Sequence, residues 1–266
     1  MNFSFSKYSG CGNDFILIDN RDQRFPDRDA SFIERLCLRR HGIGADGLIL
    51  LELSHIADFR MRIFNADGYE TEMCGNGIRC LVKFAQEIGI QKKHYTIQTM
   101  HSLLEAFPFG DSITISMTDP AEIEWDTQIE VDQTLLTVHW VDTGVPHAVI
   151  FVDELEEARW MTLAPKIRAH PHFSPKGVNV NFAQIKKEEI SLRTYERGVE
   201  QETLACGTGA TAAAIAAAKI QGISSPVSIK TRSGDNLEIQ FEKTTKFRNV
   251  RLTGPAICTF KGVLAG

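Results

Sequence analysis

The sequence predicts an α+β protein of two pseudo-symmetric domains, each made mostly of antiparallel strands wrapped around a central helix. Two observations lead to this prediction. Four sequence segments in the first half of the chain recur, in the same order, in the second half. In both copies, the block that is most alike contains a cysteine that leads directly into a helical pattern.

The duplicated blocks keep a nearly constant separation. ETEMCGNG around Cys74 returns as ETLACGTG around Cys206, and 206 − 74 gives a spacing of 132 residues. In the same way, YTIQTMHSLLEAF is similar to VSIKTRSGDNLEI, DFILIDN to HAVIFVDE, and TDPA to TGPA. Two copies alone indicate a duplication rather than a solenoid. The expected halves are 1–118, which 255–266 can rejoin, and 119–254.

Strand and helix patterns follow one another within each copy. DFILID, DGLILLEL and FRMRIFN are rich in β-branched and aromatic residues and predict strands. After Cys74 the apolar residues fall on one helical face, and Gly89 supplies a stop. After Cys206 the alanine-rich run predicts a buried helix that ends at Gly222. A helix at 32–40 is expected as an addition to the first copy only, and SIKTRSGDNLEIQF predicts a hairpin.

Composition argues against several classes of protein. The chain has 266 residues with 43% hydrophobic content, enough for one core or two smaller ones. A formal charge of −5 does not favour nucleic-acid or anionic-membrane partners. MNFSFSKYSG lacks the features of a signal peptide, and no run reaches the roughly 18 apolar residues of a membrane span. A cytoplasmic protein with reduced cysteines is expected.

Each repeated cysteine immediately precedes a predicted helix. The first N–H groups of a helix lack partners and the helix dipole is positive there, so a thiol at this place has its pKa lowered from about 8.5. The same N–H groups can bind a carboxylate. Four glycines are expected to let a ligand approach the backbone: Gly75, Gly77, Gly207 and Gly209. Each copy therefore offers a base beside a carboxylate clamp.

Two such domains facing one another would bring Cys74 and Cys206 to opposite sides of one cleft. A substrate held there by its carboxylate would lose its α-proton to one cysteine and receive a proton from the other. The helix starts would stabilise the developing negative charge. The sequence does not decide which cysteine is the resting thiolate.

The remaining four cysteines suggest less chemistry. Cys37 and Cys258 are expected as small buried hydrophobes and Cys80 as a packing residue. Cys11 lies in a glycine loop near the expected site and has no counterpart in the second copy. Close C-x2–4-C pairs for zinc and a redox CxxC are missing from the sequence. An amino-acid-binding module and a thiol–disulfide exchange protein are the competing classes, although pure binding needs no thiol.

Taken together, GCGNDF, NADG, MCGNG and ETLACGTG resemble the diaminopimelate epimerase family, over nearly the whole chain. The resemblance implies a cofactor-independent epimerase that interconverts LL- and meso-2,6-diaminopimelate through a cysteine thiolate and a cysteine thiol. It also implies a role in lysine and peptidoglycan precursor synthesis, a two-domain fold, a homodimer, and neither pyridoxal phosphate nor a metal.

The resemblance assigns a role to each matching residue. The catalytic pair is matched by Cys74 and Cys206. The clamp on the reacting carboxylate is matched by Gly75, Asn76, Gly207 and Thr208. The groups that hold the rest of the substrate are matched by Asn13, Asn65, Asn179, Glu196 and Arg197. The groups that tune the pKa of the cysteines are matched by His147 and Glu196.

Three departures from the family pattern concern substrate recognition. Val145 stands where a substrate-binding Asn is expected, and Gly47 stands where some members carry a Gln. The stretch between Arg197 and Cys206 is one residue longer than usual. A broader-specificity amino-acid racemase, acting for example on glutamate with the same two cysteines, is therefore the alternative.

Overall fold

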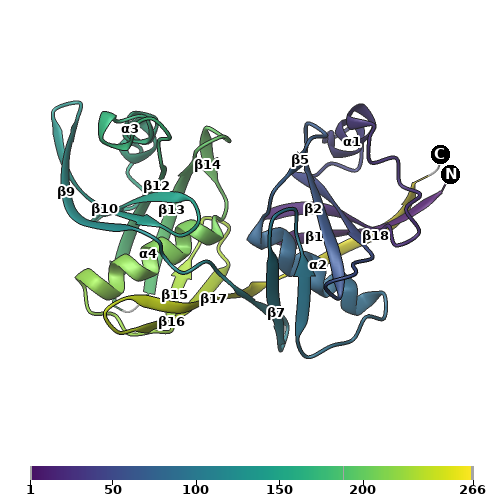
Figure 1. Ribbon diagram of the computed structural model, residues 1–266. Coiled ribbons are helices and arrows are strands. Elements are labelled where there is room, and N and C mark those ends of the chain that lie inside the picture. The colour runs from purple at the N-terminus through teal and green to yellow at the C-terminus, as the bar shows by residue number, and fades with distance from the viewer. Residues whose placement is uncertain (1, 188, 265–266) are drawn as a thin grey trace. The chain divides into compact units, whose positions relative to one another are not determined.

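The computed structural model describes residues 2–187 and 189–264, and this part of the chain forms two compact units (Figure 1). Unit 1 is the chain up to Ile115 together with the segment from Gly254 onward, and unit 2 is Ser116–Thr253. Each unit combines a mixed sheet with a few helices. The α+β prediction is confirmed.

Unit 1 is built on one sheet in the order β18–β1–β2–β3–β4–β6–β7–β8. The β2–β3 and β4–β6 pairs are parallel and the other pairs are antiparallel, while the short β5 also pairs with β4. The elements are β1 (Phe3–Gly10), β2 (Asn13–Asp19), α1 (Ala30–Cys37), β3 (Gly47–Glu52), β4 (Phe59–Asn65), β5 (Glu70–Thr71), α2 (Gly75–Glu87), β6 (Tyr95–Gln98), β7 (Leu103–Phe109), β8 (Ser112–Ser116) and β18 (Ile257–Leu264).

Unit 2 repeats this plan in the order β9–β10–β11–β12–β13–β15–β16–β17, with the short β14 beside β13. The β11–β12 and β13–β15 pairs are the parallel ones. The elements are β9 (Ile123–Val131), β10 (Thr134–Asp142), β11 (Pro146–Phe151), α3 (Arg159–Arg168), η1 (Pro171–Phe173), β12 (Asn179–Lys186), β13 (Glu189–Glu196), β14 (Gln201–Thr203), α4 (Gly207–Ile220), β15 (Val227–Lys230), β16 (Asn236–Lys243) and β17 (Phe247–Pro255).

The two units therefore have the same topology, strand for strand. The chain's last strand, β18, lies antiparallel to β1 as β9 lies antiparallel to β10. Helix α1 connects the parallel strands β2 and β3, and α3 connects β11 and β12 in the same way. The prediction of a helix at 32–40 that is unique to the first copy is wrong. The helix spans Ala30–Cys37 behind an Asp29 N-cap, and α3 is its counterpart.

Each sheet packs against the helix that follows its cysteine. Helix α2 contacts β1, β2, β3, β4 and β7, and α4 contacts β10, β11, β12, β13, β15 and β16. The apolar face of α2 is buried, and in α4 every residue from Gly209 to Ala218 is buried, as the alanine-rich run predicted. Gly89 and Gly222 follow the two helices with φ of +92° and +70°, values that favour glycine.

Gly77 and Gly209 allow these helices to lie close to their own sheets. A Cβ at Gly77 would lie 2.9 Å from Ile49 Cδ1, and one at Gly209 would lie 2.4 Å from Asn181 Oδ1. Both distances are shorter than van der Waals contact. The structure thus gives these two glycines a packing role, and the approach of a ligand to their backbone stays a prediction.

The same ion pair braces the strand before each cysteine. In unit 1, Arg62 on β4 binds both carboxylate oxygens of Glu70 on β5, at 2.9 and 2.8 Å. In unit 2, Arg193 on β13 binds Glu202 on β14 in the same way, at 2.7 and 2.9 Å. Each glutamate stands four residues before its cysteine, at Cys74 or Cys206. A bidentate, partly buried pair fixes geometry better than a single exposed contact.

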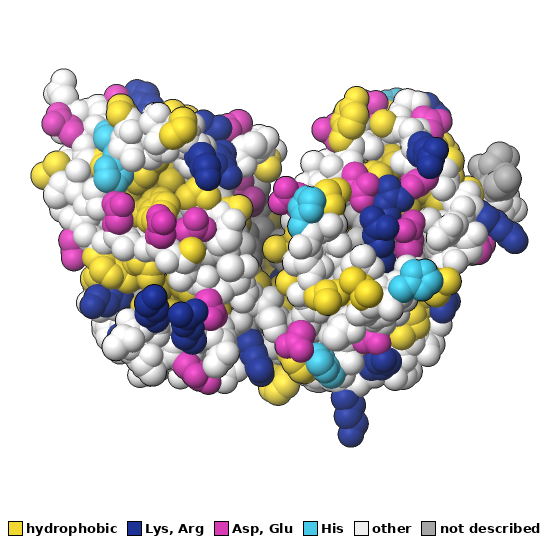
Figure 2. Space-filling model, in the orientation of Figure 1, with side chains coloured by type: hydrophobic (Ala, Val, Ile, Leu, Met, Phe, Trp, Pro, Cys, Tyr) yellow, Lys and Arg dark blue, Asp and Glu magenta, His cyan; other side chains and the backbone are white. Residues whose placement is uncertain are grey.

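The surface carries mixed charge. On the face drawn in Figure 2, Lys and Arg side chains are interspersed with Asp and Glu in each unit. This distribution agrees with the formal charge of −5 and provides no extended basic field on that face for a nucleic acid. Within the described residues, no helix has the length and apolar character needed to cross a membrane.

We predict that Gly209→Ala lowers the free energy of unfolding by about 1–3 kcal/mol, because the new methyl group overlaps Asn181 in a well-packed site. Gly207→Ala is the matched control, since its Cβ meets only the flexible end of Leu252 at 3.2 Å. Its effect should stay below about 1 kcal/mol. Urea unfolding measures both variants, and a Gly209→Ala protein as stable as the wild type would contradict the packing role.

Candidate active site

Cys74 is the N-cap residue of α2. Its backbone is extended, with φ −141° and ψ 119°, and its carbonyl accepts the first helical hydrogen bond from Ile78 N–H at 3.0 Å. The Cys74 side chain makes no capping hydrogen bond to this helix. The N–H groups of Gly75 and Asn76 therefore begin a helix at which an anion is electrostatically favoured.

Polar side chains of unit 1 surround Cys74. Its Sγ lies 3.5 Å from Oδ1 of Asn13, at the start of β2. Asn76 is buried, and its Nδ2 lies 3.4 Å from the same Asn13 oxygen. Arg79, one helical turn further along, is fully buried and donates to Asn76 Oδ1 at 2.9 Å. The structure thus brings together Asn13, Cys74 and Asn76, as the resemblance implied.

Asn65 and Gly47 lie at the same end of the unit 1 sheet. They pair in register at the end of β4 and the start of β3. Asn65 is exposed and opens the turn into β5, with its backbone N–H bound to Tyr69 O at 2.9 Å. A Cβ at Gly47 would lie 2.4 Å from Phe64 O, so this backbone has no room for a longer side chain at that position.

Cys206 caps α4 as Cys74 caps α2. Its φ of −121° and ψ of 111° are again extended, its side chain makes no capping hydrogen bond, and its carbonyl accepts from Ala210 N–H at 2.9 Å. Its partners differ, however, because Sγ lies 3.4 Å from Thr208 Oγ1 and the thiol is hydrogen bonded to Glu196. Glu196 also accepts from Thr203 Oγ1 at 2.5 Å.

The environment of Glu196 acts on its pKa in two directions. Burial raises the pKa of this carboxyl above its ordinary value, while the hydrogen bonds from Thr203 and Cys206 lower it, and the net shift is upward. A carboxylate with a raised pKa is a better match for a thiol proton than an ordinary surface carboxylate. Cys206 therefore has an ionisable partner, where Cys74 has the neutral amide of Asn13.

His147 on β11 is fully buried and neutral. Its Nδ1 lies 3.0 Å from Nδ2 of Asn181, whose own Oδ1 accepts from Thr194 Oγ1 at 3.0 Å. Asn181 therefore donates, and the histidine proton sits on Nε2. Burial first, and the charge of Arg197 second, lower the pKa of His147 to about 3. Among the described residues, Nε2 has no hydrogen-bond partner.

Asn179 and Arg197 lie together on β12 and at the end of β13. The Asn179 Oδ1 accepts from the backbone N–H of Arg197 at 2.8 Å, and the Arg197 guanidinium donates to Lys176 O at 3.0 Å. Val145 lies just before β11, with its carbonyl accepting from Thr143 N–H at 3.2 Å. Its apolar side chain adds no hydrogen-bonding group at that position.

The residue by which the second copy exceeds the first lies in a hairpin turn. Phe64 pairs with Glu70 in unit 1, and Tyr195 pairs with Glu202 in unit 2. Five residues separate the first pair (70 − 64 − 1) and six separate the second (202 − 195 − 1). The insertion therefore follows Glu196 and leaves the spacing from Glu202 to Cys206 unchanged.

In the described part of the chain, none of the other cysteines forms a disulfide. Cys37 and Cys80 are buried, which raises the pKa of Cys37 to about 12 and moves that of Cys80 in the same direction. Cys11 is buried beside Arg79, whose Nη2 lies 3.4 Å from its Sγ. Cys258 is only partly buried on β18, so the prediction of a buried hydrophobe there is wrong.

Sequence reasoning missed three supporting residues. Asn181 lies two positions after Asn179, so strand alternation places both on one face of β12, and this spacing was a usable signal. Asp46 binds Asn13 Nδ2 at 2.8 Å across two neighbouring strands, a contact that depends on parallel pairing rather than on sequence spacing. Arg79 is one turn after Cys74, yet an arginine at that spacing usually points to solvent.

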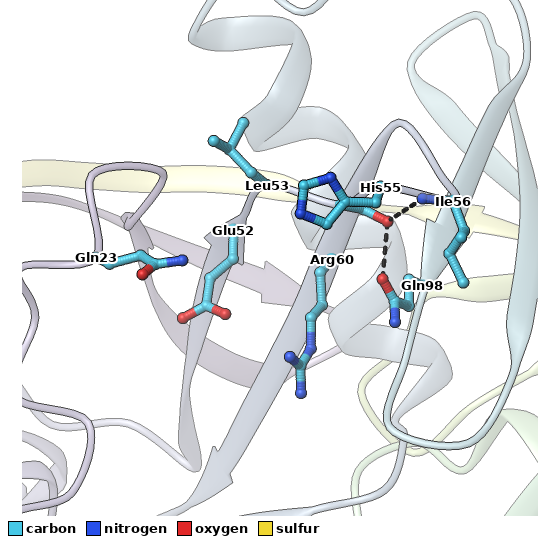
Figure 3. A pocket seen from close by; sticks show the side chains of 8 residues that line it. Gln23, Glu52, Leu53, His55, Ile56, Arg60 and Gln98 are labelled. Atoms are coloured by element: carbon cyan, nitrogen blue, oxygen red, sulfur yellow. Dashed lines mark hydrogen bonds between the residues drawn. The ribbon is translucent and has the colours of Figure 1, made fainter.

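Two hollows in unit 1 lie away from Cys74. One of about 300 Å³ is lined by Glu52, Arg60 and Gln98, with neighbouring loop residues (Figure 3). A second of about 380 Å³ also includes Glu52. Glu52 pairs with Arg60 at the end of β3 and β4 opposite Gly47 and Asn65. The described residues contain no group of three or more His, Cys, Asp or Glu side chains arranged to hold a metal ion.

Comparisons with known proteins agree with this arrangement. The diaminopimelate epimerase family profile matches residues 5–123 and 139–258. The diaminopimelate epimerase of Aquifex aeolicus is 41% identical over 275 residues, which cover 98% of this chain and 97% of that protein. The diaminopimelate epimerase of Chlorobaculum tepidum is 43% identical over 261 residues, covering 96% and 99%.

Solved structures share the fold at low sequence identity. A Bacillus anthracis phenazine biosynthesis protein of the PhzF family has a TM-score of 0.73 at 14% identity, covering 100% of this chain and 99% of that one. A hydroxyproline epimerase from Agrobacterium vitis has a TM-score of 0.71 at 17% identity, covering 99% and 91%.

The fold, together with relatives of this similarity, defines the class: the protein is an isomerase, and within that class an epimerase. The family-profile match and the relatives at about 40% identity over nearly the full chain identify the family within this class. The chain belongs to the diaminopimelate epimerase family.

We predict that His147 stays neutral in the folded protein down to a pH of about 3, because burial opposes its charged form. In the unfolded chain it takes a proton near pH 6.5, so the folded state loses stability as pH falls from about 6.5 toward about 3. His147→Gln should flatten this pH dependence, and His55→Gln, at an exposed site, should not. Urea unfolding at several pH values measures the slope, and equal slopes in the wild type and His147→Gln would contradict the assignment.

Proposed function

We propose that the protein interconverts LL- and meso-2,6-diaminopimelate by a two-base mechanism that uses Cys74 and Cys206. The observation that carries the proposal is that both cysteines are the N-cap residues of equivalent helices, each with an extended backbone that leads directly into the first helical turn. Each turn thus combines a thiol with a favourable position for a carboxylate. Relatives more than 40% identical over nearly the full chain are diaminopimelate epimerases, which supports this substrate.

The proposed reaction moves one proton off the substrate and one proton on. One cysteine, as thiolate, takes the α-proton, so the C–H bond breaks, an S–H bond forms, and the electron pair is delocalised into the bound carboxylate. The other cysteine, as thiol, gives its proton to the opposite face of the same carbon. The reaction inverts the centre and leaves the two thiols with exchanged protonation states.

The helix starts supply the electrostatic part of the mechanism. Backbone N–H groups of Gly75 and Asn76, and of Gly207 and Thr208, bind the reacting carboxylate in this proposal and stabilise the charge it gains. Because the units are topological copies, each contributes one base and one helix start. We take the unit 1 and unit 2 halves as the two working domains of the epimerase.

In this scheme the remaining site residues bind the substrate or adjust the protonation of the two cysteines. Asn65, Asn179 and Arg197 bind the distal amino-acid end of the substrate in this proposal. Asn13, whose side chain lies beside Cys74, is a further substrate-binding residue. Glu196 accepts from the substrate ammonium group and exchanges a proton with Cys206, to which it is hydrogen bonded. Neutral His147 contributes an Nε2–H donor that favours a nearby thiolate, which its buried, partner-free nitrogen supports.

The biological setting is part of the proposal. An enzyme making meso-diaminopimelate serves lysine and peptidoglycan precursor synthesis, and we expect it to act in the cytoplasm without a cofactor. We also propose a homodimer. Large apolar side chains exposed on β18, at Ile257, Phe260 and Val263, support a second copy as a partner.

We predict that Cys74→Ala and Cys206→Ala each reduce epimerisation of LL-diaminopimelate by at least about a thousandfold, because each removes one of two required proton carriers. Cys258→Ala is the matched control, since this cysteine pairs with Tyr8 of β1 and has no part in the proposed mechanism, and its turnover should stay near that of the wild type. A coupled assay or chiral chromatography measures the meso product. Full activity in either catalytic variant would reject the two-base mechanism.

Substrate range separates the proposal from a broader-specificity racemase. We predict that diaminopimelate turns over at least about a hundredfold faster, by kcat/KM, than glutamate, aspartate or proline. Arg197 and the site asparagines would be left unpaired by a shorter substrate. Comparable rates for glutamate and diaminopimelate would instead favour the racemase, and Val145→Asn would then test whether this position sets the range.

A further inference from the structure

Two side-chain amides beside Cys74 form a hydrogen-bond chain between a buried cation and a carboxylate. Arg79 Nη2 donates to Asn76 Oδ1 at 2.9 Å, and Asn76 Nδ2 lies 3.4 Å from Asn13 Oδ1. Asn13 Nδ2 in turn donates to Asp46 Oδ2 at 2.8 Å. Cys74 Sγ lies 3.5 Å from the same Asn13 oxygen, so the thiol joins the chain at its centre.

The two charged residues at the ends of this chain determine which amide atoms donate and which accept. A guanidinium can only donate hydrogen bonds and an ionised carboxylate can only accept them. Arg79 therefore donates to the amide oxygen of Asn76, and Asp46 accepts from the amide nitrogen of Asn13. The amide of Asn13 is left with one orientation, in which its oxygen faces Cys74. An oxygen acceptor favours a thiol S–H over a thiolate at that distance.

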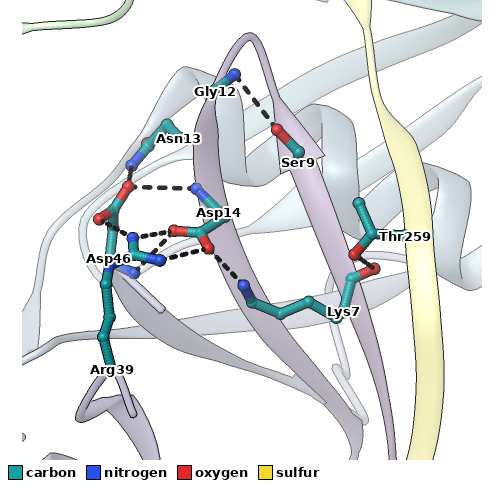
Figure 4. A network of polar contacts seen from close by, with 8 residues as sticks. All are labelled: Lys7, Ser9, Gly12, Asn13, Asp14, Arg39, Asp46 and Thr259. Atoms are coloured by element: carbon teal, nitrogen blue, oxygen red, sulfur yellow. Dashed lines mark hydrogen bonds and ion pairs between the residues drawn. The ribbon is translucent and has the colours of Figure 1, made fainter. Parts of the chain in front are cut away.

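Both ends are themselves anchored. Asp46 Oδ1 binds Arg39 Nη2 at 2.8 Å, and the same guanidinium binds Asp14 at 2.7 Å (Figure 4). Asp14 is also paired with Lys7. Arg79 is fully buried, with its other nitrogens near Gly75 O and Pro255 O. The acidic end thus lies within an ion-pair network, and the basic end lies within the packed core.

We propose that Asp46 and Arg79 are positioning residues, which together hold the Asn13 amide with its oxygen toward Cys74 and keep Cys74 as a hydrogen-bond-donating thiol in the free enzyme. The use of that thiol in catalysis rests on the proposed function. The orientation of the amide does not, because it follows from contacts within unit 1 alone.

The hydrogen bonds found among the described residues of unit 2 do not repeat this chain. Val145 precedes His147 by two residues as Asn13 precedes Phe15, and His147 and Phe15 hold equivalent places in the parallel pairs β11–β12 and β2–β3. Thr211 stands five residues after Cys206, where Arg79 stands five after Cys74. Cys206 meets the Glu196 carboxylate instead. The duplication has therefore given one cysteine a fixed amide acceptor and the other a proton-accepting carboxylate.

Further charged or titratable groups belong to the same contact network or lie close to Cys74 in the sequence. Besides Asp46 and Arg79, they are Lys7, Cys11, Asp14, Arg39, Glu72 and Cys80. Only Asp46 loses its charge in the Asp46→Asn variant, so the direct effect of that charge on Cys74 has to be separated from its effect through Asn13. A double-mutant cycle with Asn13→Ala makes this separation.

The test measures the rate of iodoacetamide alkylation of Cys74 against pH in the full-length, substrate-free protein, read by mass spectrometry of the Cys74 peptide. In the Asp46→Asn variant, the side-chain amide at position 46 can both donate and accept a hydrogen bond. The Asn13 amide is then able to turn its nitrogen toward the Cys74 sulfur, which favours the thiolate. We expect the midpoint of the alkylation profile to fall by about one pH unit, which is about tenfold faster labelling below the midpoint. Asp19→Asn, which breaks the Asp19–Arg21 pair at the other end of β2, should leave the profile unchanged.

Two results would overturn the proposal. One is an Asp46→Asn profile identical to that of the wild type. The other is a full shift on adding Asp46→Asn to Asn13→Ala, since Asp46 would then act by charge alone. If Asp46→Asn does not fold, Asp46→Ser replaces the carboxylate by a hydroxyl that can donate as well as accept; the same downward shift is expected, and no shift rejects the proposal. Wild-type protein that alkylates as described but does not epimerise diaminopimelate would reject the proposed function alone.

Discussion

The close packing of each cysteine-led helix on its own sheet is the constraint on which the rest of the structure depends. A Cβ at Gly77 or Gly209 would lie 2.9 or 2.4 Å from a side chain of the facing sheet, so each helix start packs closely on the core. The preceding strands are fixed as well, by the Arg62–Glu70 and Arg193–Glu202 pairs. A cysteine placed between a braced strand and a packed helix holds its sulfur and the neighbouring N–H groups in one geometry, which preorganised acid–base chemistry requires.

Duplication has preserved this scaffold and varied what surrounds each sulfur. The sheet order, the crossing helix, the glycines and the ion pairs recur in both units. The partner of the thiol does not, because Cys74 meets the Asn13 amide and Cys206 meets Glu196. A two-base inversion needs one thiol and one thiolate at the same time, and two identical environments would favour the same protonation state in both. The divergence of the polar partners fits that requirement.

The scaffold was predictable from sequence because its signals are local or repeated. The cysteine turns, the helical periodicity after Cys74 and the alanine-rich run after Cys206 each lie in one short segment, and the repeat placed them in equivalent elements. The helix at α3 was missed because its apolar pattern is weak and contains Pro165. Asp46 and Arg79 were missed because their partners lie across parallel strands or inside the core. Parallel register and the burial of a single arginine have no sequence period to reveal them.

The most direct test of the two-base account is the position of deuterium in the first product formed in deuterated water. The enzyme is mixed with LL-diaminopimelate, and both isomers are analysed by mass spectrometry at a few per cent conversion. The account predicts one solvent deuterium in nearly every meso product molecule and almost none in the recovered LL substrate, because a thiol that has exchanged with solvent delivers the new proton to the opposite face. Product that retains the substrate proton, or recovered substrate already rich in deuterium, would mean that a single base serves both faces and would contradict the central claim.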